Sequence, residues 1–250
     1  MGFLGGLFGR RKKEILPPAD LSLLGTDVHS HFIPGIDDGA KTMEDSLSML
    51  RTMQEFGYKK VITTPHIMSD FYRNTPEIIL SGLDKLREAA HKENIDITIE
   101  AAAEYYLDIE LEDKIRKKEL LTFGNNYVLF EMPFVGEPKN LSRAIFEMQM
   151  AGYKPVLAHV ERYLFWHREP EKAQTLFDKG VILQLNLNSL SGHYSPQVQK
   201  SAEQLLDSEI IGLLGTDCHN MGHLELLKQS STLPYFHKAM KINNLLNHSL

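Results

Sequence analysis

The sequence predicts an α/β protein, a distorted barrel of seven β/α units with its active site at the C-terminal ends of the strands. Two observations favour this fold. Short apolar runs rich in β-branched residues alternate along the chain with longer stretches of helical periodicity. Seven such units within about 225 residues fit one closed or distorted barrel better than two separate sheets.

The predicted elements follow one another in regular order. Strands are expected near residues 24–29, 59–65, 96–103, 126–132, 155–160, 181–187 and 210–216, where apolar runs are closed by turn signals. Helices are expected near residues 42–56, 76–92, 108–118, 139–152, 169–179, 195–208 and 233–247, where apolar residues recur with helical spacing. Gly57, Gly152 and Gly180 stand where three helices should end, because glycine readily closes a helix in the left-handed conformation. A parallel sheet covered by helices follows from this alternation.

Length and composition favour one large domain. The 250 residues, 42% hydrophobic and 24% charged, suffice to bury a sizeable core. Because no Gly/Ser/Pro-rich linker interrupts the chain, we expect a single barrel domain at residues 21–250 after a flexible tail at residues 1–20. No apolar run approaches the roughly 20 residues that span a bilayer.

Charge and cysteine content exclude some classes of protein. The formal net charge of −6 argues against a nucleic-acid partner. Cys218 is the only cysteine, which excludes an internal disulfide framework and suits a reducing cytoplasm. Residues 3–13 combine apolar and basic side chains, which has two interpretations: a weak contact with the anionic inner face of the membrane, or a frayed glycine-rich tail.

Potential metal ligands stand at the ends of nearly all the predicted strands. They are His29 and His31 after the first strand, Asp38 in the loop that follows, His66 after the second, Glu104 after the third, Glu131 after the fourth, His159 after the fifth, and Asp217 and His219 after the seventh. In a β/α barrel these strand ends meet around one mouth. Taken singly, each histidine could be a packed or hydrogen-bonded structural residue, and each carboxylate could be a helix cap.

Spacing strengthens the pattern, because residues i and i+2 of an extended strand point the same way. His29 therefore converges with His31, and Asp217 with His219, while Cys218 between the latter two points elsewhere. Carboxylates gathered in one place would repel one another and lose hydration, and bound cations offset that cost. Imidazoles and carboxylates without a thiolate suit Mn, Fe, Zn or Mg. The sequence thus predicts a metal centre.

The ordered motifs are similar to those of the PHP (polymerase and histidinol phosphatase) superfamily, and more narrowly to the bacterial tyrosine-protein phosphatases of the CpsB/CapC type. The matching stretches are D-V-H-S-H with D-D-G, T-T-P-H, A-E-Y-Y, L-F-E-M-P, A-H-V-E-R-Y and G-T-D-C-H-N, which together span residues 27–220. This resemblance implies a PHP-type barrel that holds three divalent cations, with manganese first among the candidates.

The resemblance also implies a set of ligands for each ion. The implied ligands are His29, His31, Glu104 and Asp217 for the first ion, Asp38, His66 and His219 for the second, and Glu131 and His159 for the third. Glu104 is also implied to bridge the third ion to the first. The implied reaction is hydrolysis of a phosphomonoester by a metal-activated hydroxide, without a covalent enzyme intermediate. Arg162 is the expected catalytic and substrate-binding residue, as a bidentate partner for the phosphate. The alternative interpretation is that Arg162 is a surface arginine paired with Glu161.

Two details near the last motif bear on mechanism. Cysteine-based phosphatases use a C-x5-R loop, but Leu224 stands six residues after Cys218, so Cys218 is not expected to be a nucleophile. The arginine expected a few residues after the D-x-H-N motif is absent, and His223 and Lys228 are the nearby candidates for a second phosphate contact. His193, in the loop after the sixth strand, is a candidate general acid, although an ordinary loop histidine is the other interpretation.

The implied substrate is a phosphotyrosine-bearing protein, a membrane-associated bacterial tyrosine autokinase in capsule or exopolysaccharide biosynthesis. Two alternatives remain open at this point. One is a small-molecule phosphatase such as a histidinol-phosphate phosphatase, and the other is a metal-stabilised scaffold that binds the kinase.

Overall fold

The computed structural model of the chain describes residues 15–169 and 171–250. The membrane contact expected at residues 3–13 lies outside the described residues. In the part that is described, no helix is long and apolar enough to cross a bilayer.

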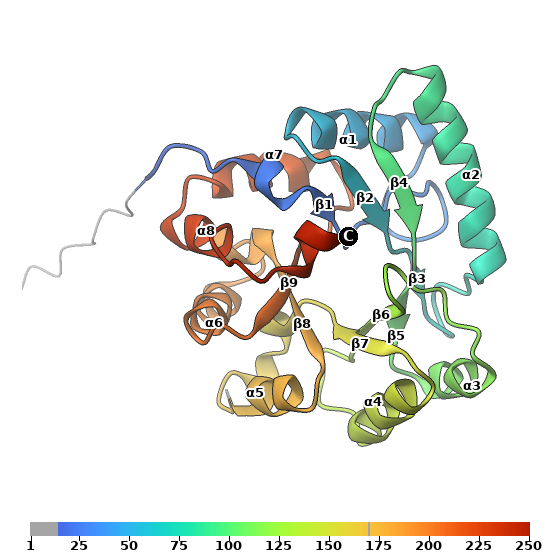
Figure 1. Cartoon of the computed structure of the whole chain (residues 1–250), viewed down its shortest axis with the longest axis vertical. Coiled ribbons are helices and arrows are strands. Elements are labelled where there is room, and N and C mark those ends of the chain that lie inside the picture. Colours follow the sequence, from blue (N-terminus) through green and yellow to red (C-terminus); the bar gives the residue numbers. More distant parts are fainter. Residues whose placement is uncertain (1–14, 170) are drawn as a thin grey trace, which may run out of the picture.

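The strands form an incompletely closed parallel barrel with helices around it (Figure 1). One sheet has the order β1-β2-β4 and the other the order β3-β5-β6-β7-β8-β9. The strands are β1 (Thr26–Asp27), β2 (Lys60–Thr63), β3 (His66–Ile67), β4 (Thr98–Ala101), β5 (Glu104–Tyr106), β6 (Tyr127–Glu131), β7 (Lys154–Leu157), β8 (Ile182–Asn186) and β9 (Ile211–Gly215). The predicted α/β barrel is confirmed.

Two of the seven predicted strands are broken, which accounts for the distortion of the barrel. The strand expected at 59–65 is split into β2 and β3 by Thr64 and Pro65, and the one expected at 96–103 continues as β5 after Ala102 and Ala103. Proline has no N–H to donate to a neighbouring strand, so the ladder is interrupted there. The first half of each strand pairs in the smaller sheet and the second half in the larger one.

The barrel closes between β1 and β9 by contacts other than a strand ladder. The N–H of Asp217 donates to the carbonyl of His29 at 2.8 Å, and the N–H of His31 donates to the carbonyl of Cys218 at 2.9 Å. Below them the buried Asp27 carboxylate accepts from the N–H of Thr216 at 2.9 Å and from its hydroxyl at 3.0 Å. Closure therefore occurs at the level of the predicted ligands.

Eight α-helices occur in the described part of the chain, most of them near the expected positions. They are α1 (Met43–Glu55), α2 (Pro76–Lys92), α3 (Ile109–Lys117), α4 (Leu141–Met150), α5 (Glu171–Asp178), α6 (Pro196–Asp207), α7 (Met221–Ser230) and α8 (Pro234–Ala239). Gly57, Gly152 and Gly180 follow α1, α4 and α5 with φ angles of 91°, 91° and 80°, which confirms that they close these helices.

The chain's C-terminal part differs from the prediction. α7 was not expected, and the helix predicted at 233–247 is wrong, since α8 ends at Ala239 and a 3₁₀ turn covers Leu246–Ser249. The buried Asn247 explains why a longer helix does not form. Its Oδ1 accepts from the N–H of Leu214 at 3.0 Å, and its Nδ2 donates to the carbonyls of Leu214 at 2.8 Å and Thr26 at 2.9 Å. This side chain fills the gap between β1 and β9.

Replacing Asn247 with Ala should lower the free energy of unfolding by about 2–4 kcal/mol, because buried peptide groups of β1 and β9 lose their partners. Urea unfolding followed by circular dichroism measures this loss. Asn244→Ala, at an exposed position of the same segment, is the matched control. Equal stability of the two variants would contradict the bridging role of Asn247.

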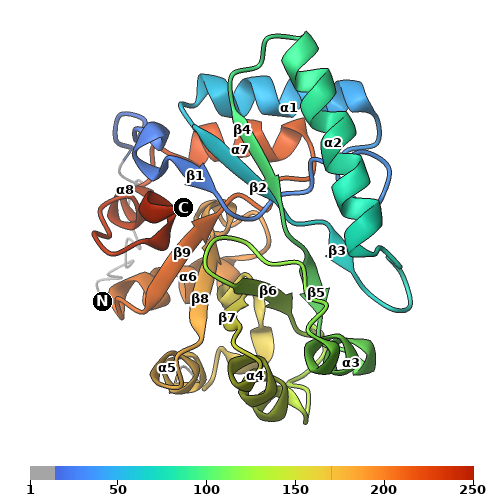
Figure 2. The same ribbon diagram turned by 45° about the vertical axis from the view of Figure 1, so that its right-hand side comes forward.

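Apolar side chains from the strands fill the barrel below the mouth. This inner core contains Val28, Ile62, Ala102, Phe123, Leu129, Val156, Ala158 and Leu213, while a larger core packs between the sheets and the helices. Figure 2 shows the strands β5 to β9 running side by side. Polar groups at the strand ends are thus held above a packed apolar floor.

Candidate metal centre

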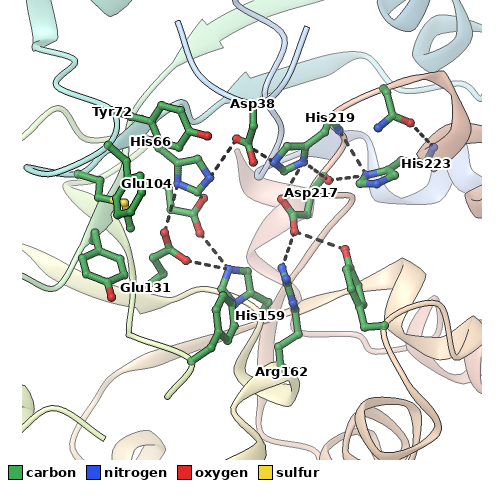
Figure 3. A pocket seen from close by; sticks show the side chains of 16 residues that line it. Asp38, His66, Tyr72, Glu104, Glu131, His159, Arg162, Asp217, His219 and His223 are labelled. Atoms are coloured by element: carbon green, nitrogen blue, oxygen red, sulfur yellow. Dashed lines mark hydrogen bonds and ion pairs between the residues drawn. The ribbon is translucent and has the colours of Figure 1, made fainter. Parts of the chain in front are cut away.

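A cavity of about 610 Å³ opens at the C-terminal ends of the strands (Figure 3). Its polar lining includes Asp38, His66, Glu104, Glu131, His159, Arg162, Asp217, His219 and His223, and its apolar lining includes Met68, Phe71, Tyr72, Tyr106, Phe134 and Tyr194. His29 and His31 lie beneath these residues and are fully buried.

All nine residues that the sequence singled out as ligands are brought together here. They form four overlapping groups whose ligand atoms lie within 4.8 Å of one another: His31, Asp38, His66 and His219; His29, His31 and Glu104; His29, His159 and Asp217; and His66, Glu104 and Glu131. The groups differ in part from the sets implied by the resemblance, since His66 also faces Glu131, and His159 also faces Asp217.

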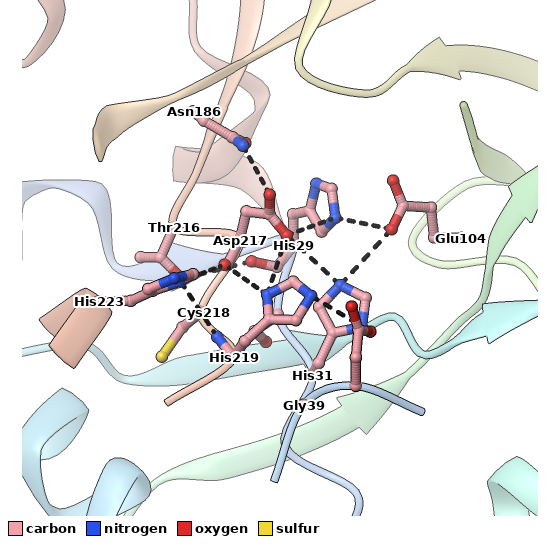
Figure 4. Close-up of polar contacts among 12 residues, drawn as sticks. His29, His31, Gly39, Glu104, Asn186, Thr216, Asp217, Cys218, His219 and His223 are labelled. Atoms are coloured by element: carbon pink, nitrogen blue, oxygen red, sulfur yellow. Dashed lines mark hydrogen bonds and ion pairs between the residues drawn. The ribbon is translucent and has the colours of Figure 1, made fainter. Parts of the chain in front are cut away.

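Glu104 lies at the middle of the cluster. Its Oε2 is 3.1 Å from Nε2 of His29 and 3.3 Å from Nδ1 of His66, and its Oε1 is 3.0 Å from Nε2 of His159. The carboxylate thus faces several imidazoles, as a bridging ligand would, and Figure 4 shows it next to those of His29 and His31.

Two buried side chains orient the histidines of the first strand. Nδ1 of His31 donates to Oδ2 of Asp37 at 2.8 Å, and Nδ1 of His29 donates to Oε1 of Gln184 at 3.0 Å. Each contact uses Nδ1 and turns Nε2 into the cluster, where it is the nitrogen available to an ion. Oδ1 of Asp37 also accepts from the N–H of Gly39 at 2.9 Å, which ties the D-D-G loop to His31.

The unpartnered nitrogens fit metal ions. Among the described side chains, Nε2 of His31, Nδ1 of His66 and Nδ1 of His159 are buried without a hydrogen-bond partner. Nε2 of His31 lies 3.4 Å from Oδ1 of Asp217 and 3.5 Å from Oε2 of Glu104, longer than a charge-assisted hydrogen bond. Two ligands about 2.1 Å from one shared ion are about 3.0–3.4 Å apart, which is close to these separations.

The electrostatics of the cluster favour bound positive charge. Burial alone would lower the pKa of His29, yet the carboxylates of Glu104 and Asp217 raise it to about 9. Burial alone would raise the pKa of Glu104, yet the imidazoles of His29 and His66 hold it well below its usual range. Cations therefore compete with protons for the imidazole nitrogens, and the same buried carboxylates stabilise either positive charge.

Arg162 lies at the cavity wall. Its Nη1 donates to Oδ2 of Asp217 at 3.1 Å, and its guanidinium stacks 4.2 Å from the ring centre of Tyr194 and 4.8 Å from that of Phe134. Stacking between two rings limits the rotamers of the long side chain. The other N–H groups of the planar fork remain available to an anion in the cavity.

The alternative pairing of Arg162 with Glu161 does not occur within 4 Å in the described structure. Glu161 is buried, and Oε1 accepts from the hydroxyl of Ser189 at 2.6 Å and from the N–H of Asn186 at 3.1 Å. Burial raises the pKa of Glu161 to about 7. Glu161 thus stabilises the loop after β8 rather than a surface arginine.

Several residues that support the site were not predicted from the sequence. Asp37 was inside the quoted D-D-G motif, yet only Asp38 was singled out. Gln184 and Asn186 are polar residues at i and i+2 in the otherwise apolar β8, a signal that both face the barrel interior. Nε2 of Gln184 donates to Oδ1 of Asn186 at 2.9 Å. Nδ2 of Asn186 in turn donates to Oδ2 of Asp217 at 2.8 Å. This buried chain of amides links the ligand ends of β1 and β9.

The structure also distinguishes the two basic candidates of the last motif. His223 lines the cavity and its Nδ1 lies 3.0 Å from the carbonyl of Asp217, whereas Lys228 lies exposed near the end of α7. Cys218 is fully buried, its sulfur is 3.7 Å from that of Met49, and burial raises its thiol pKa well above the usual range. Its side chain points away from the imidazoles (Figure 4).

Fold and site together define a class of protein: a β/α barrel hydrolase that depends on divalent metal ions. A family of capsular polysaccharide synthesis proteins, CpsB/CapC, matches residues 25–232 of the chain. The chain belongs to the CpsB/CapC family, as its motifs had indicated.

Relatives with curated names carry the same description. Tyrosine-protein phosphatase YwqE of Bacillus subtilis is 31% identical over 78% of this chain and 77% of its own length. Tyrosine-protein phosphatase CpsB of Streptococcus pneumoniae is 27% identical over 86% of this chain and 88% of its own.

Solved structures agree with this assignment. One from a study of YwqE of Bacillus subtilis and CpsB of Streptococcus pneumoniae, described as unique metal-dependent tyrosine phosphatases, matches with a TM-score of 0.79 at 28% identity and covers 90% of each chain. A lactonase from Listeria monocytogenes matches with a TM-score of 0.57 at 12% identity, a likeness of fold alone.

Proposed function

We propose that this chain is a metal-dependent protein-tyrosine phosphatase. One observation carries the proposal: nine candidate metal ligands gather at or just beneath one cavity with aromatic walls, and Arg162 lies in its wall. The tyrosine phosphatases named among its relatives support the same activity. We further propose that the substrate is a tyrosine kinase of capsule or exopolysaccharide biosynthesis and that the reaction takes place in the cytoplasm at the inner face of the membrane.

The proposed cofactors are three divalent cations, with manganese first and Fe, Zn or Mg as alternatives. The residues that would hold them are His29, His31, Asp38, His66, Glu104, Glu131, His159, Asp217 and His219. Bound divalent cations supply two kinds of chemistry. They lower the pKa of a bound water so that hydroxide is available near neutral pH, and they neutralise the charge of the phosphoryl oxygens.

The chain's own residues position the substrate. Arg162, fixed between Phe134 and Tyr194 and anchored on Asp217, offers a planar pair of N–H donors to two phosphoryl oxygens. Asp37 and Gln184 keep His31 and His29 in one tautomer and one orientation, so that the imidazoles do not rearrange during turnover. A thiolate nucleophile has no place here, because Cys218 is buried outside the cavity.

The apolar walls favour an aromatic phosphomonoester over a small polar one. Tyr72, Tyr106 and Phe134 face a cavity of about 610 Å³, which is deep enough to take a phenyl ring above the phosphate. Tyrosinate, whose conjugate acid has a pKa of about 10, leaves more readily than an alkoxide and needs less help from a general acid. Histidinol phosphate would leave these walls largely uncovered.

Substrate preference tests the proposed function. The purified protein supplied with Mn²⁺ should hydrolyse a phosphotyrosine peptide with a kcat/KM at least about 100-fold above that for histidinol phosphate, since only the former buries an apolar phenyl ring against the walls. Cys218→Ala should retain this activity within a few-fold. Release of phosphate from each substrate at several concentrations gives both constants.

A preference for histidinol phosphate would contradict the proposed substrate class. Binding of the phosphopeptide without any release of phosphate would instead favour a metal-stabilised scaffold. Loss of all activity in Cys218→Ala, with the fold intact, would contradict the metal-dependent mechanism.

A further inference from the structure

We infer that an apolar rim on one side of the cavity mouth binds the residues that flank the phosphotyrosine of a polypeptide substrate. The rim consists of five exposed side chains: Phe71, Ile109, Phe134, Val135 and Leu164. The inference rests on the proposed function and describes what the same site recognises beyond the phosphorylated ring.

The rim residues lie in the four segments that follow β3, β5, β6 and β7, which are neighbours in the six-stranded sheet (Figure 2). Ile109 is the first residue of α3, and Leu164 begins a 3₁₀ turn. Val135 is 97% exposed, Ile109 79% and Phe71 76%. Large apolar side chains contribute little to the stability of a monomer when they are exposed to solvent. Several of them close together indicate a binding surface.

The opposite side of the mouth has a different character. Among the described residues, the segments between β1, β8 or β9 and the next α-helix expose one large hydrophobic side chain, Met221 at the start of α7, which is 36% exposed. That side presents Asp38, Asn220 and His223 to the cavity instead. A peptide that places its phosphotyrosine in the cavity therefore meets most of the exposed apolar surface on the rim side, which defines where its flanking residues lie.

The rim is continuous with the cavity wall. Phe71 and Phe134 line the cavity as well as its edge. The N–H of Ser69 donates to Oδ2 of Asp108 at 3.1 Å, which joins the loop of Phe71 to the start of α3, where Ile109 lies. The ring of Phe134 stacks on that of Tyr163 at 5.7 Å, next to Leu164. A ligand that fills the cavity thus leaves it directly across the rim.

A polypeptide with apolar flanking residues is the occupant that this arrangement fits. A free phosphotyrosine or a small phosphate ester ends inside the cavity and cannot reach Ile109 or Val135. A polypeptide must continue past the mouth in both directions. Apolar side chains on either side of the phosphotyrosine would then cover the rim and shield it from solvent. Covering one such side chain corresponds to about a tenfold gain in affinity.

Matched substrates and variants test the rim. One phosphotyrosine peptide carries Leu, Ile or Val at the positions next to the phosphotyrosine, and a second carries Ser or Gln at the same positions. The wild-type protein with Mn²⁺ should show a kcat/KM about tenfold higher for the apolar peptide. In Ile109→Gln and Val135→Gln, this ratio should fall to between about one and three, because a neutral polar side chain removes the apolar contact without adding charge.

Two references make the result specific. Each rate is expressed relative to the variant's own turnover of p-nitrophenyl phosphate, which corrects for any change at the catalytic cavity. Phe146→Gln, on the outer surface of α4 where Phe146 is 60% exposed, should keep the wild-type ratio. The polar substitutions are at exposed positions, so the variants should fold as the wild type does.

Equal rates for the two peptides in the wild-type protein would overturn the inference. Rim variants with the same peptide ratio as Phe146→Gln would also overturn it. The same holds for rim variants that lose only self-association or vesicle binding and keep the wild-type peptide ratio. Failure of every phosphotyrosine substrate, with p-nitrophenyl phosphate still hydrolysed, would overturn the proposed function and the rim with it.

Discussion

Replacing Asp217 with Asn should lower kcat/KM on a phosphotyrosine peptide at least about a thousandfold. Oδ1 of Asp217 lies 3.4 Å from nitrogens of His29, His31 and His219, and Oδ2 accepts from Arg162 at 3.1 Å. The amide removes the negative charge from both sets of contacts. Charge stabilisation by a metal centre is worth several kcal/mol, and about 1.4 kcal/mol corresponds to a factor of ten in rate.

Metal analysis of the same samples separates the two roles of Asp217. Inductively coupled plasma mass spectrometry should show fewer bound ions per chain in Asp217→Asn, and circular dichroism should show an unchanged fold. Asp84→Asn, which alters an exposed carboxylate on α2, is the control and should match the wild type in both measurements. Asp217→Asn with more than about a tenth of wild-type activity would contradict a role as ligand.

Gly39→Ala should reduce both metal content and activity, the latter by about 100-fold or more. A Cβ atom at position 39 would lie 2.2 Å from the carbonyl oxygen of His31 and 2.4 Å from its Cβ, too close for any contact between such atoms. The backbone of the D-D-G loop must therefore move, and with it Asp37, whose Oδ2 lies 2.8 Å from Nδ1 of His31. Asp38, the neighbouring candidate ligand, moves as well.

Gly136→Ala provides the matched comparison, because nothing lies within 4 Å of a Cβ built there. Titration of the apoprotein with Mn²⁺, followed by activity at each concentration, should give a weaker apparent affinity for Gly39→Ala and a wild-type curve for Gly136→Ala. Indistinguishable curves for the two variants would show that the loop adapts to the extra methyl group at no cost to the site.

Much of the fold was predictable because it depends on local patterns. Six of the seven predicted helices occur close to the expected residues, since their apolar spacing and their closing glycines act within a few residues. The C-terminal region was not predictable in this way. Asn247 ends up buried between β1 and β9, 221 residues from its partner Thr26 and 33 residues from its partner Leu214, and its hydrogen bonds replace a longer helix.

The candidate ligands were predictable for a related reason. Parallel strands of a barrel bring their C-terminal ends to one mouth whatever the loops between them do, so a histidine or carboxylate at each strand end points to a common site. The side chains that orient the ligands carried a weaker signal: Gln184 is a polar residue in an apolar strand, and Asp37 is an ordinary loop carboxylate. Only folding places them 3.0 Å and 2.8 Å from the Nδ1 atoms of His29 and His31.

By itself, the sequence determined which groups are available for metal binding and at which strand ends they stand. Only the tertiary structure decided how those groups face one another. His159 and Asp217 adopt left-handed backbone conformations, with φ of 35° and 50°, which turn their side chains toward Glu104 and Arg162. Such conformations carry a cost that distant packing must offset, so the pattern of neighbouring residues does not specify them.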